Sequence, residues 1–176
     1  DLLFLRGIEI ETAEEIHMVC YFPDLPRALE AAEIVGHALP PIQNRPDIFG
    51  RQLFLDEQDK IVGQEERMLI TACSLSLEKT VALVRSLGGA AIPAHVDKPS
   101  NSIIASLGYI PPEFGFTTLE VSTQANLEKI TYPYQIIQSS DAHYLHQILD
   151  RKNKIEICGY CIKDVINFLL KTGDEI

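Results

Sequence analysis

The chain has 176 residues, of which 46% are hydrophobic and 23% are charged, and its formal net charge is −10 at pH 7. This length suits one domain with a sizeable core, and the composition is near the average of soluble globular proteins. The negative charge disfavours long nucleic acids and anionic membranes as partners, because phosphate surfaces attract basic faces. It leaves open a phosphate ester held by metal ions, since the ions supply positive charge locally.

Targeting and redox signals in the sequence favour a cytoplasmic protein. No apolar run reaches the roughly 20 residues that a membrane span needs, and no signal-peptide pattern opens the chain. The four cysteines do not have the spacing of a secreted disulfide framework. Cys158 and Cys161 could form half of a zinc knuckle, but no second pair accompanies them.

Hydrophobic patterns predict strands that alternate with helices along the chain. The expected strands cover residues 2–12, 16–22, 89–92, 117–122, 134–137 and 155–158. The expected helices begin at Asp24, Ser76, Ser102 and Cys161, and a turn or short helix is expected at 126–129. Strands apolar enough to be covered on both faces predict an α/β fold with a mostly parallel layer or barrel.

Residues 44–66 interrupt this alternation. An apolar run at 52–55, a polar stretch at 56–60 and a second apolar pair at 61–62 predict a hairpin or an extended excursion. Because the segment is long and irregular, we expect it to be an insertion that contributes to substrate specificity.

Strand-like runs in this chain end in carboxylates and imidazoles. The apolar run 89–92 leads to His95, an early run carries Glu9, and a later run ends in Asp141 and His143. Strands of α/β folds present chemical groups at their C-terminal ends, so we expect these side chains to share a site. Carboxylate oxygens combined with imidazole nitrogens suit Zn, Mn or Fe.

Each candidate residue also has an ordinary structural interpretation. Taken alone, Glu9 is more often a solvated carboxylate at a strand end, and His17 is more often a packed strand histidine. His95 is a stronger candidate, because an apolar strand that ends in His-x-Asp-Lys is unusual. Lys98 and Arg51 are candidates for holding a phosphate group, since both side chains carry the required positive charge.

Four short motifs together resemble the PHP (polymerase and histidinol phosphatase) superfamily. They are GIEI at 7–10, HMVCYF at 17–22, PAHVDK at 93–98 and SDAH at 140–143, in the family's order and approximate spacing. The resemblance spans about residues 5–144. It implies a distorted (β/α)7 TIM-like barrel over residues 1–176, with two or three metal ions at the C-terminal ends of its strands.

The resemblance also implies roles for individual residues. Glu9 would bridge two ions, and His17 and His95 would complete the shell of the second ion. Asp141 would bind the first ion and His143 the third, so both would be catalytic. The implied protein is a metal-dependent phosphoric ester hydrolase that acts through a metal-activated water on a phosphomonoester or short oligonucleotide.

The sequence departs from the family pattern at its beginning. The family's first motif, His-x-His, is absent, and Asp1 already lies inside a strand-like run. We therefore expect an incomplete barrel whose first βα units precede Asp1, and such a chain alone would be inactive. A smaller departure is Val96 where the family often has proline, with Lys98 where it often has arginine. Glu11 has no family role and is expected to be solvated or to lie outside the ligand shell.

Two other interpretations remain open at this point. The chain could be a non-catalytic PHP-like module that binds metal for a structural or regulatory purpose. It could also be an unrelated hydrolase or deaminase barrel that uses Glu9, His17 and His95 around one ion.

Overall fold

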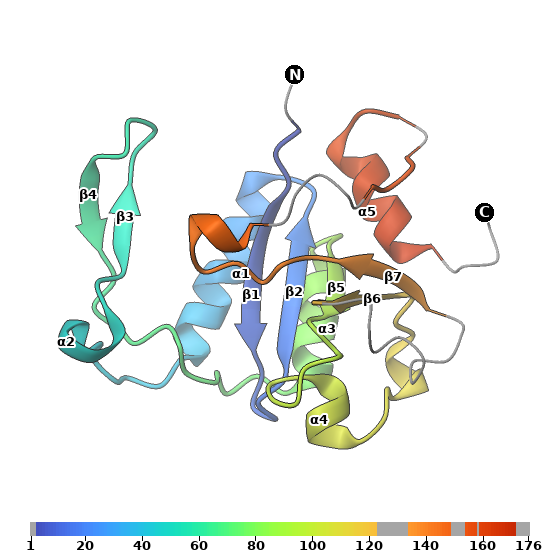
Figure 1. Cartoon of the computed structure of the whole chain (residues 1–176), viewed down its shortest axis with the longest axis horizontal. Helices are drawn as coiled ribbons and strands as arrows, with labels where there is room; N and C mark the ends of the chain where they lie inside the picture. Colours follow the sequence, from blue (N-terminus) through green and yellow to red (C-terminus); the bar gives the residue numbers. More distant parts are fainter. Residues whose placement is uncertain (1–2, 123–133, 149–153, 158, 172–176) are drawn as a thin grey trace.

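The structure is a computed structural model that describes residues 3–122, 134–148, 154–157 and 159–171. In chain order, the elements are β1 (Arg6–Glu11), β2 (His17–Phe22), α1 (Leu25–Ala38), α2 (Pro46–Phe49), β3 (Leu53–Leu55), β4 (Ile61–Gln64), α3 (Leu77–Ser86), β5 (Ala90–Pro93), α4 (Ile103–Leu107), the 3-10 turn η1 (Pro112–Phe114), β6 (Thr118–Val121), β7 (Gln135–Gln138), the 3-10 turn η3 (Leu145–Gln147) and α5 (Ile162–Leu170). Strands and helices are mixed along the chain, with pairs of consecutive described strands at β1–β2, β3–β4 and β6–β7 (Figure 1).

A three-stranded sheet in the order β1-β2-β5 forms the centre of the molecule, and both of its strand pairs are antiparallel. The expected mostly parallel layer is therefore wrong for this sheet. The physical reason for the antiparallel pairing of β1 and β2 is the tight turn between them, where the Thr12 N–H donates to the Ile16 carbonyl at 2.9 Å. A connection this short can only join antiparallel neighbours.

Parallel pairing occurs between β6 and β7, which form a two-stranded sheet of their own. The hairpin β3–β4 is a third sheet and projects away from the centre (Figure 1). The described residues thus form a mixed α/β fold of three small sheets in which no barrel closes.

Helix starts follow the sequence signals. Asp24 caps α1 by accepting the Arg27 N–H at 3.0 Å, and Ser76 caps α3 by accepting the Lys79 N–H at 3.3 Å. Ser102 caps α4 in the same way. These side chains satisfy amide groups that the first turn of a helix leaves unpaired. The predicted helix starts are thereby confirmed.

Two predicted segments near the C-terminus have different outcomes. Residues 155–157 are not in a strand, so the strand predicted there is wrong for the part that the structure describes. Residue 158 and the turn or helix predicted at 126–129 lie outside the described residues.

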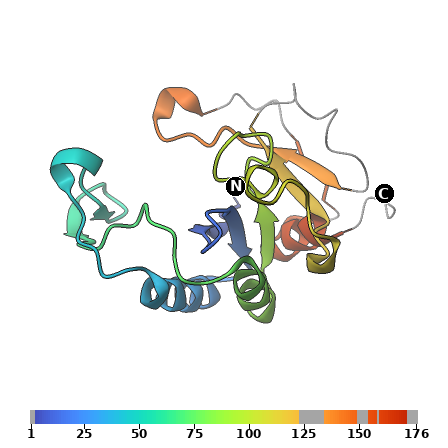
Figure 2. The same ribbon diagram turned by 90° about the horizontal axis from the view of Figure 1, so that it is seen from below.

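Hydrophobic side chains cover both faces of the central sheet. On one face, α1 and α3 pack on β1 and β2 (Figure 2), and the shared core includes Met18, Phe22 and Val84. On the other, α5 packs against Ala90 and Ile92 of β5. Burial on both faces explains why the β5 sequence is a continuous apolar run. The segment that follows β5 therefore starts inside the molecule.

The excursion at 44–66 contains α2 and the β3–β4 hairpin, as the apolar pattern predicted for its second half. Gln52 links the two chain segments at the start and the end of this hairpin, because its side-chain amide donates to the carbonyls of Glu65 and Arg67 at 2.9 and 2.6 Å. No helix in the described ranges has the length and hydrophobicity required to cross a membrane.

Candidate metal centre

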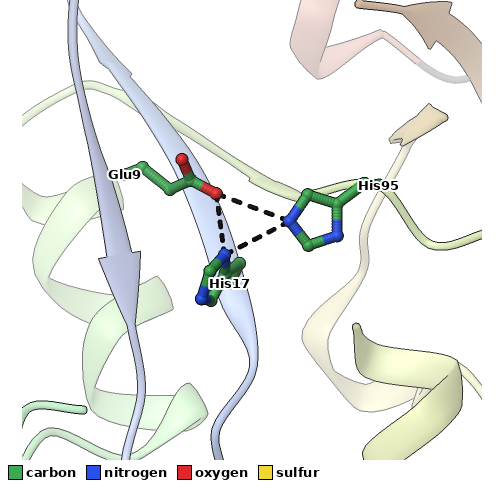
Figure 3. Close-up of side chains that lie close together, drawn as sticks. All are labelled: Glu9, His17 and His95. Carbon is green, nitrogen blue, oxygen red and sulfur yellow. Dashed lines mark hydrogen bonds and ion pairs between the residues drawn. The ribbon is translucent and has the colours of Figure 1, made fainter. Parts of the chain in front are cut away.

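Glu9, His17 and His95 converge on one point at the end of the central sheet (Figure 3). Glu9 Oε1 lies 3.0 Å from His17 Nδ1 and 3.5 Å from His95 Nε2. The two imidazole nitrogens, His17 Nδ1 and His95 Nε2, are 3.2 Å apart. This triad is the group of three His, Cys, Asp or Glu side chains that could hold one metal ion in the described part of the chain.

Strand register explains how residues so far apart in sequence meet. Glu11 of β1 lies opposite His17 of β2, and Glu9 lies opposite Val19, so the alternation of a strand places all three polar side chains on one face. His95 follows β5, which pairs with β2 on the other side, and the Ala94 N–H donates to the His17 carbonyl at 3.1 Å. The sheet thus brings the three ligand-type atoms together on one face, at the same end of the three strands.

The triad's geometry fits a divalent transition metal. In a tetrahedral shell with metal–ligand distances of about 2.0–2.1 Å, neighbouring ligand atoms are about 3.3–3.4 Å apart. The three measured separations, 3.0, 3.2 and 3.5 Å, bracket this value. One carboxylate with two imidazoles is a donor set that suits Zn, Mn or Fe. The residues present therefore fit one such ion.

The electrostatics of the triad favour a cation. The hydrogen bond from His17, followed by that from His95, holds the pKa of Glu9 well below its usual range. The same bond raises the pKa of His17, although partial burial opposes the shift. Glu9 is therefore held as a carboxylate, the form that binds a metal ion.

His95 is held in an unusual backbone conformation. Its φ of +29° lies in the left-handed region, which side chains with a Cβ rarely adopt. The side chain is 4% exposed, and its Nδ1 is buried without a hydrogen-bond partner among the described residues. The polar contacts of the ring are consequently those of Nε2, which faces Glu9 and His17.

The remaining predicted site residues do not join the triad. Asp141 forms an ion pair with Lys98, and its Coulombic effect contributes to the raised pKa of His17. His143 is exposed, and its Nδ1 lies 3.0 Å from the Asp141 carbonyl oxygen. Arg51 is exposed on the excursion, where its guanidinium is 3.4 Å from Gln64 Oε1. The structure therefore brings together three of the five predicted metal ligands.

Two further carboxylates contact the triad from outside: Glu120, which sequence reasoning did not assign, and Glu11, which was expected to be solvated or to lie outside the ligand shell. Glu120 of β6 is buried and accepts the His95 N–H at 3.2 Å. Glu11 Oε2 lies 3.9 Å from His17 Nε2, and Glu11 Oε1 accepts from the Asn101 side chain at 3.2 Å. The available signal for Glu120 was a single charged residue inside an apolar strand.

One triad residue, Glu9, lines a cavity of about 320 Å³. Its lining is largely apolar and runs from Glu9 and Glu11 on β1, past Val35 of α1, to Phe54 and Arg67. Phe54 belongs to the 44–66 excursion, so this segment borders a space that begins at a triad residue.

Comparisons with known proteins give a fold but no family. No protein-family model and no curated protein matches the chain. The lesion-specific endonuclease PfuEndoQ from Pyrococcus furiosus is similar in structure, with a TM-score of 0.66 and 18% sequence identity over 93% of this chain. An Endonuclease Q complex with a 27-mer duplex that carries an abasic lesion at the active site has a TM-score of 0.54 and 19% identity over 78% of this chain. The chain spans 38% and 31% of the lengths of these two proteins.

Proposed function

We propose that the chain belongs to a metal-dependent phosphoesterase and that Glu9, His17 and His95 hold one of its catalytic ions. The observation that carries this proposal is the triad itself, in which one carboxylate oxygen and two imidazole nitrogens lie within 3.5 Å of one another. Two imidazole nitrogens with one carboxylate oxygen form a donor set that holds catalytic zinc in other proteins.

Two further observations support the phosphoesterase class. The four motifs that resemble the PHP superfamily include all three triad residues. The fold is similar to that of a DNA lesion-specific endonuclease, a protein that cleaves phosphodiester bonds. We therefore assign this chain a phosphate ester as substrate, either a phosphomonoester or a short oligonucleotide. The net charge of −10 disfavours a long nucleic acid on its surface.

The chain's own residues have separable roles in this proposal. Glu9, His17 and His95 bind the ion, and a divalent ion so held would lower the pKa of a coordinated water and stabilise charge on phosphate oxygens. The ammonium group of Lys98 is paired with Asp141, and in this proposal it would also contact a phosphate that enters beside that carboxylate. Asp141 and His143 would accept and relay a proton from the attacking water.

A second candidate function is a non-catalytic metal-binding module. The Lys98–Asp141 ion pair favours it, because a carboxylate engaged by an ammonium group is not free to bind a further ion. A single ion in the triad would then serve structure or regulation. The two candidates differ in a measurable way, since only the first predicts hydrolysis.

Metal content and hydrolysis should be measured on the same preparation. The protein is purified without chelator, its Zn, Mn and Fe are quantified by mass spectrometry, and turnover is assayed with and without added Mn²⁺. Suitable substrates are p-nitrophenyl phosphate, bis(p-nitrophenyl) phosphate and an end-labelled single-stranded oligonucleotide of about ten nucleotides. Bound metal with hydrolysis supports the phosphoesterase, and the preferred substrate identifies the ester class.

The control for this assay is a second histidine variant. His95→Ala removes a triad ligand and should lower metal content and turnover by at least about tenfold. His37→Ala, on the exposed surface of α1, should change neither. Bound metal without turnover on any of the three substrates would favour the non-catalytic module. Near-zero metal and no turnover after Mn²⁺ addition would rule out both candidates.

A further inference from the structure

We propose that Glu120 is a positioning residue: it holds the backbone of His95, and thereby the imidazole of this residue, in the orientation that the triad requires. Its consequence for metal binding rests on the proposed function. Its consequence for the geometry of His95 does not, because the contacts involved lie within the protein.

Glu120 makes contact with two successive amides of the segment that follows β5. Its carboxylate oxygen Oε2 accepts the His95 N–H at 3.2 Å, and its main-chain carbonyl accepts the Val96 N–H at 2.9 Å. The first of these bonds falls on the residue whose φ is +29°. A strained backbone conformation persists where its surroundings hold it in place. Glu120 supplies that restraint.

Glu120 is itself firmly placed. It lies in β6, whose four residues are all buried, and the Ser139 hydroxyl donates to its second carboxylate oxygen, Oε1. One carboxylate oxygen therefore accepts the Ser139 hydroxyl, and the other accepts the His95 N–H. A side chain anchored at one end in this way can transmit the position of β6 to the triad.

A carboxylate at this position is difficult to explain by stability alone. Glu120 is 6% exposed, and burial raises its pKa, which means that the environment disfavours the charged form. Burying a polar or charged group costs free energy that its hydrogen bonds have to offset. The role of Glu120 is instead to hold His95, because its carboxylate accepts the His95 N–H. The ring nitrogen Nε2 of the residue held in this way lies 3.2 Å from His17 Nδ1.

The test compares three variants of the purified protein. Glu120→Ala removes the acceptor, and Glu120→Gln keeps an oxygen that can accept the His95 N–H while its amide donates to Ser139. Thr118→Val is the matched control, because Thr118 is a buried polar residue of the same strand that donates to the Leu169 carbonyl rather than to the His95 segment. All three are characterised by thermal unfolding, so that a loss of folding is recognised.

Two measurements follow on each folded variant. The first is Co²⁺ affinity from the visible absorption of the bound ion, and the second is the exchange rate of the His95 amide proton by NMR. We expect Glu120→Ala to weaken Co²⁺ binding by about 10- to 100-fold and to accelerate exchange at His95. Glu120→Gln should stay within about threefold of the wild type in both. Thr118→Val should lower the unfolding temperature without changing either.

The outcomes separate this inference from the proposed function. If the wild type binds Co²⁺ and Glu120→Ala binds it equally, with unchanged exchange at His95, the positioning role is overturned while the metal site stands. If the wild type binds no Co²⁺, the metal site is overturned, and the exchange rate at His95 alone decides whether Glu120 positions this residue. If Glu120→Ala and Thr118→Val lose the same amount of Co²⁺ affinity and accelerate exchange at His95 equally, Glu120 has only a general structural role and the inference is overturned.

Discussion

Lys98 and Asp141, 43 positions apart in the chain, form an ion pair beside the triad. Both had been expected to serve the site separately, Lys98 by holding a phosphate and Asp141 by binding metal. Their pairing places a cation next to a site that is proposed to bind a divalent ion. The pair therefore opposes metal binding at Asp141 and leaves the triad as the stronger site.

The first prediction follows from this repulsion. Lys98→Met removes a unit positive charge and should tighten Mn²⁺ binding, by on the order of fivefold, because the ammonium group and the metal ion repel each other. The same variant should raise KM for a phosphate ester if Lys98 contacts the phosphate. Mn²⁺ binding is measured by electron paramagnetic resonance, with Lys60→Met on the exposed hairpin as control. Unchanged Mn²⁺ affinity in Lys98→Met would contradict the electrostatic argument.

A second prediction concerns the stability of the ion-free protein. The hydrogen bond between Glu9 and His17 lowers the pKa of Glu9 from 4.5 and raises that of His17 from 6.5. A lowered pKa contributes stability above 4.5 that is lost as pH falls through the folded value. A raised pKa contributes stability below 6.5 that is lost as pH rises through the folded value. The pair should therefore stabilise the fold most between about pH 4.5 and 6.5.

Urea unfolding in the presence of chelator measures this effect. The difference in midpoint between the wild type and His17→Gln should be largest between about pH 4.5 and 6.5 and should shrink as the pH rises above 6.5 through the raised pKa of His17. His37→Gln provides the baseline for an exposed histidine. A difference that stays constant across this range would show that the Glu9–His17 interaction does not depend on the imidazole proton.

The third prediction concerns the core that supports the sheet. Phe22 ends β2 and is fully buried, so Phe22→Ala should leave a cavity and lower the free energy of unfolding by about 3–5 kcal/mol. Phe22→Leu, which preserves most of the volume, should cost less. Both are measured by equilibrium urea unfolding. A loss below about 1 kcal/mol for the alanine variant would mean that this part of the core collapses around the deletion.

The fourth prediction concerns the 44–66 excursion as a specificity element. Phe54 is 53% exposed and lines the cavity next to Glu9, so Phe54→Ala should have little effect on stability. It should raise KM for an oligonucleotide while leaving turnover of p-nitrophenyl phosphate unchanged. Ile61→Ala is the control, because Ile61 is an equally exposed residue of the same hairpin that does not line the cavity. Parallel effects of both variants on KM would argue against a role for the cavity.

The triad residues could be selected from the sequence because their short motifs resemble those of the PHP superfamily, and His95 also follows an apolar strand. Taken alone, Glu9 and His17 have the pattern of ordinary strand residues. The helix starts at Asp24 and Ser76 were predictable for a local reason, since a cap contacts amides within its own first turn. Features that depend on contacts between residues close in sequence, such as helix caps, could thus be predicted from the sequence.

Glu120 and the strand directions were not predictable in this way. The residues around Glu120 alternate like a strand with one polar face, yet all four residues of β6 are buried. Periodicity reports which side chains share a face but not what covers that face. The direction of β5 relative to β2 depends in the same way on how the chain between them packs. The pairing of Asp141 with Lys98 is likewise a tertiary contact that no motif spacing reports.

The order of the strands also determines when the triad can exist during folding. Glu9 and His17 belong to one antiparallel hairpin, a local structure that forms early. His95 is 78 positions after His17 and reaches it only when β5 pairs with β2, which requires closing a long loop. We therefore expect the site to assemble in two stages, first the local pair of ligands and then the distant third. A chain that holds an ion through all three has already completed its central sheet.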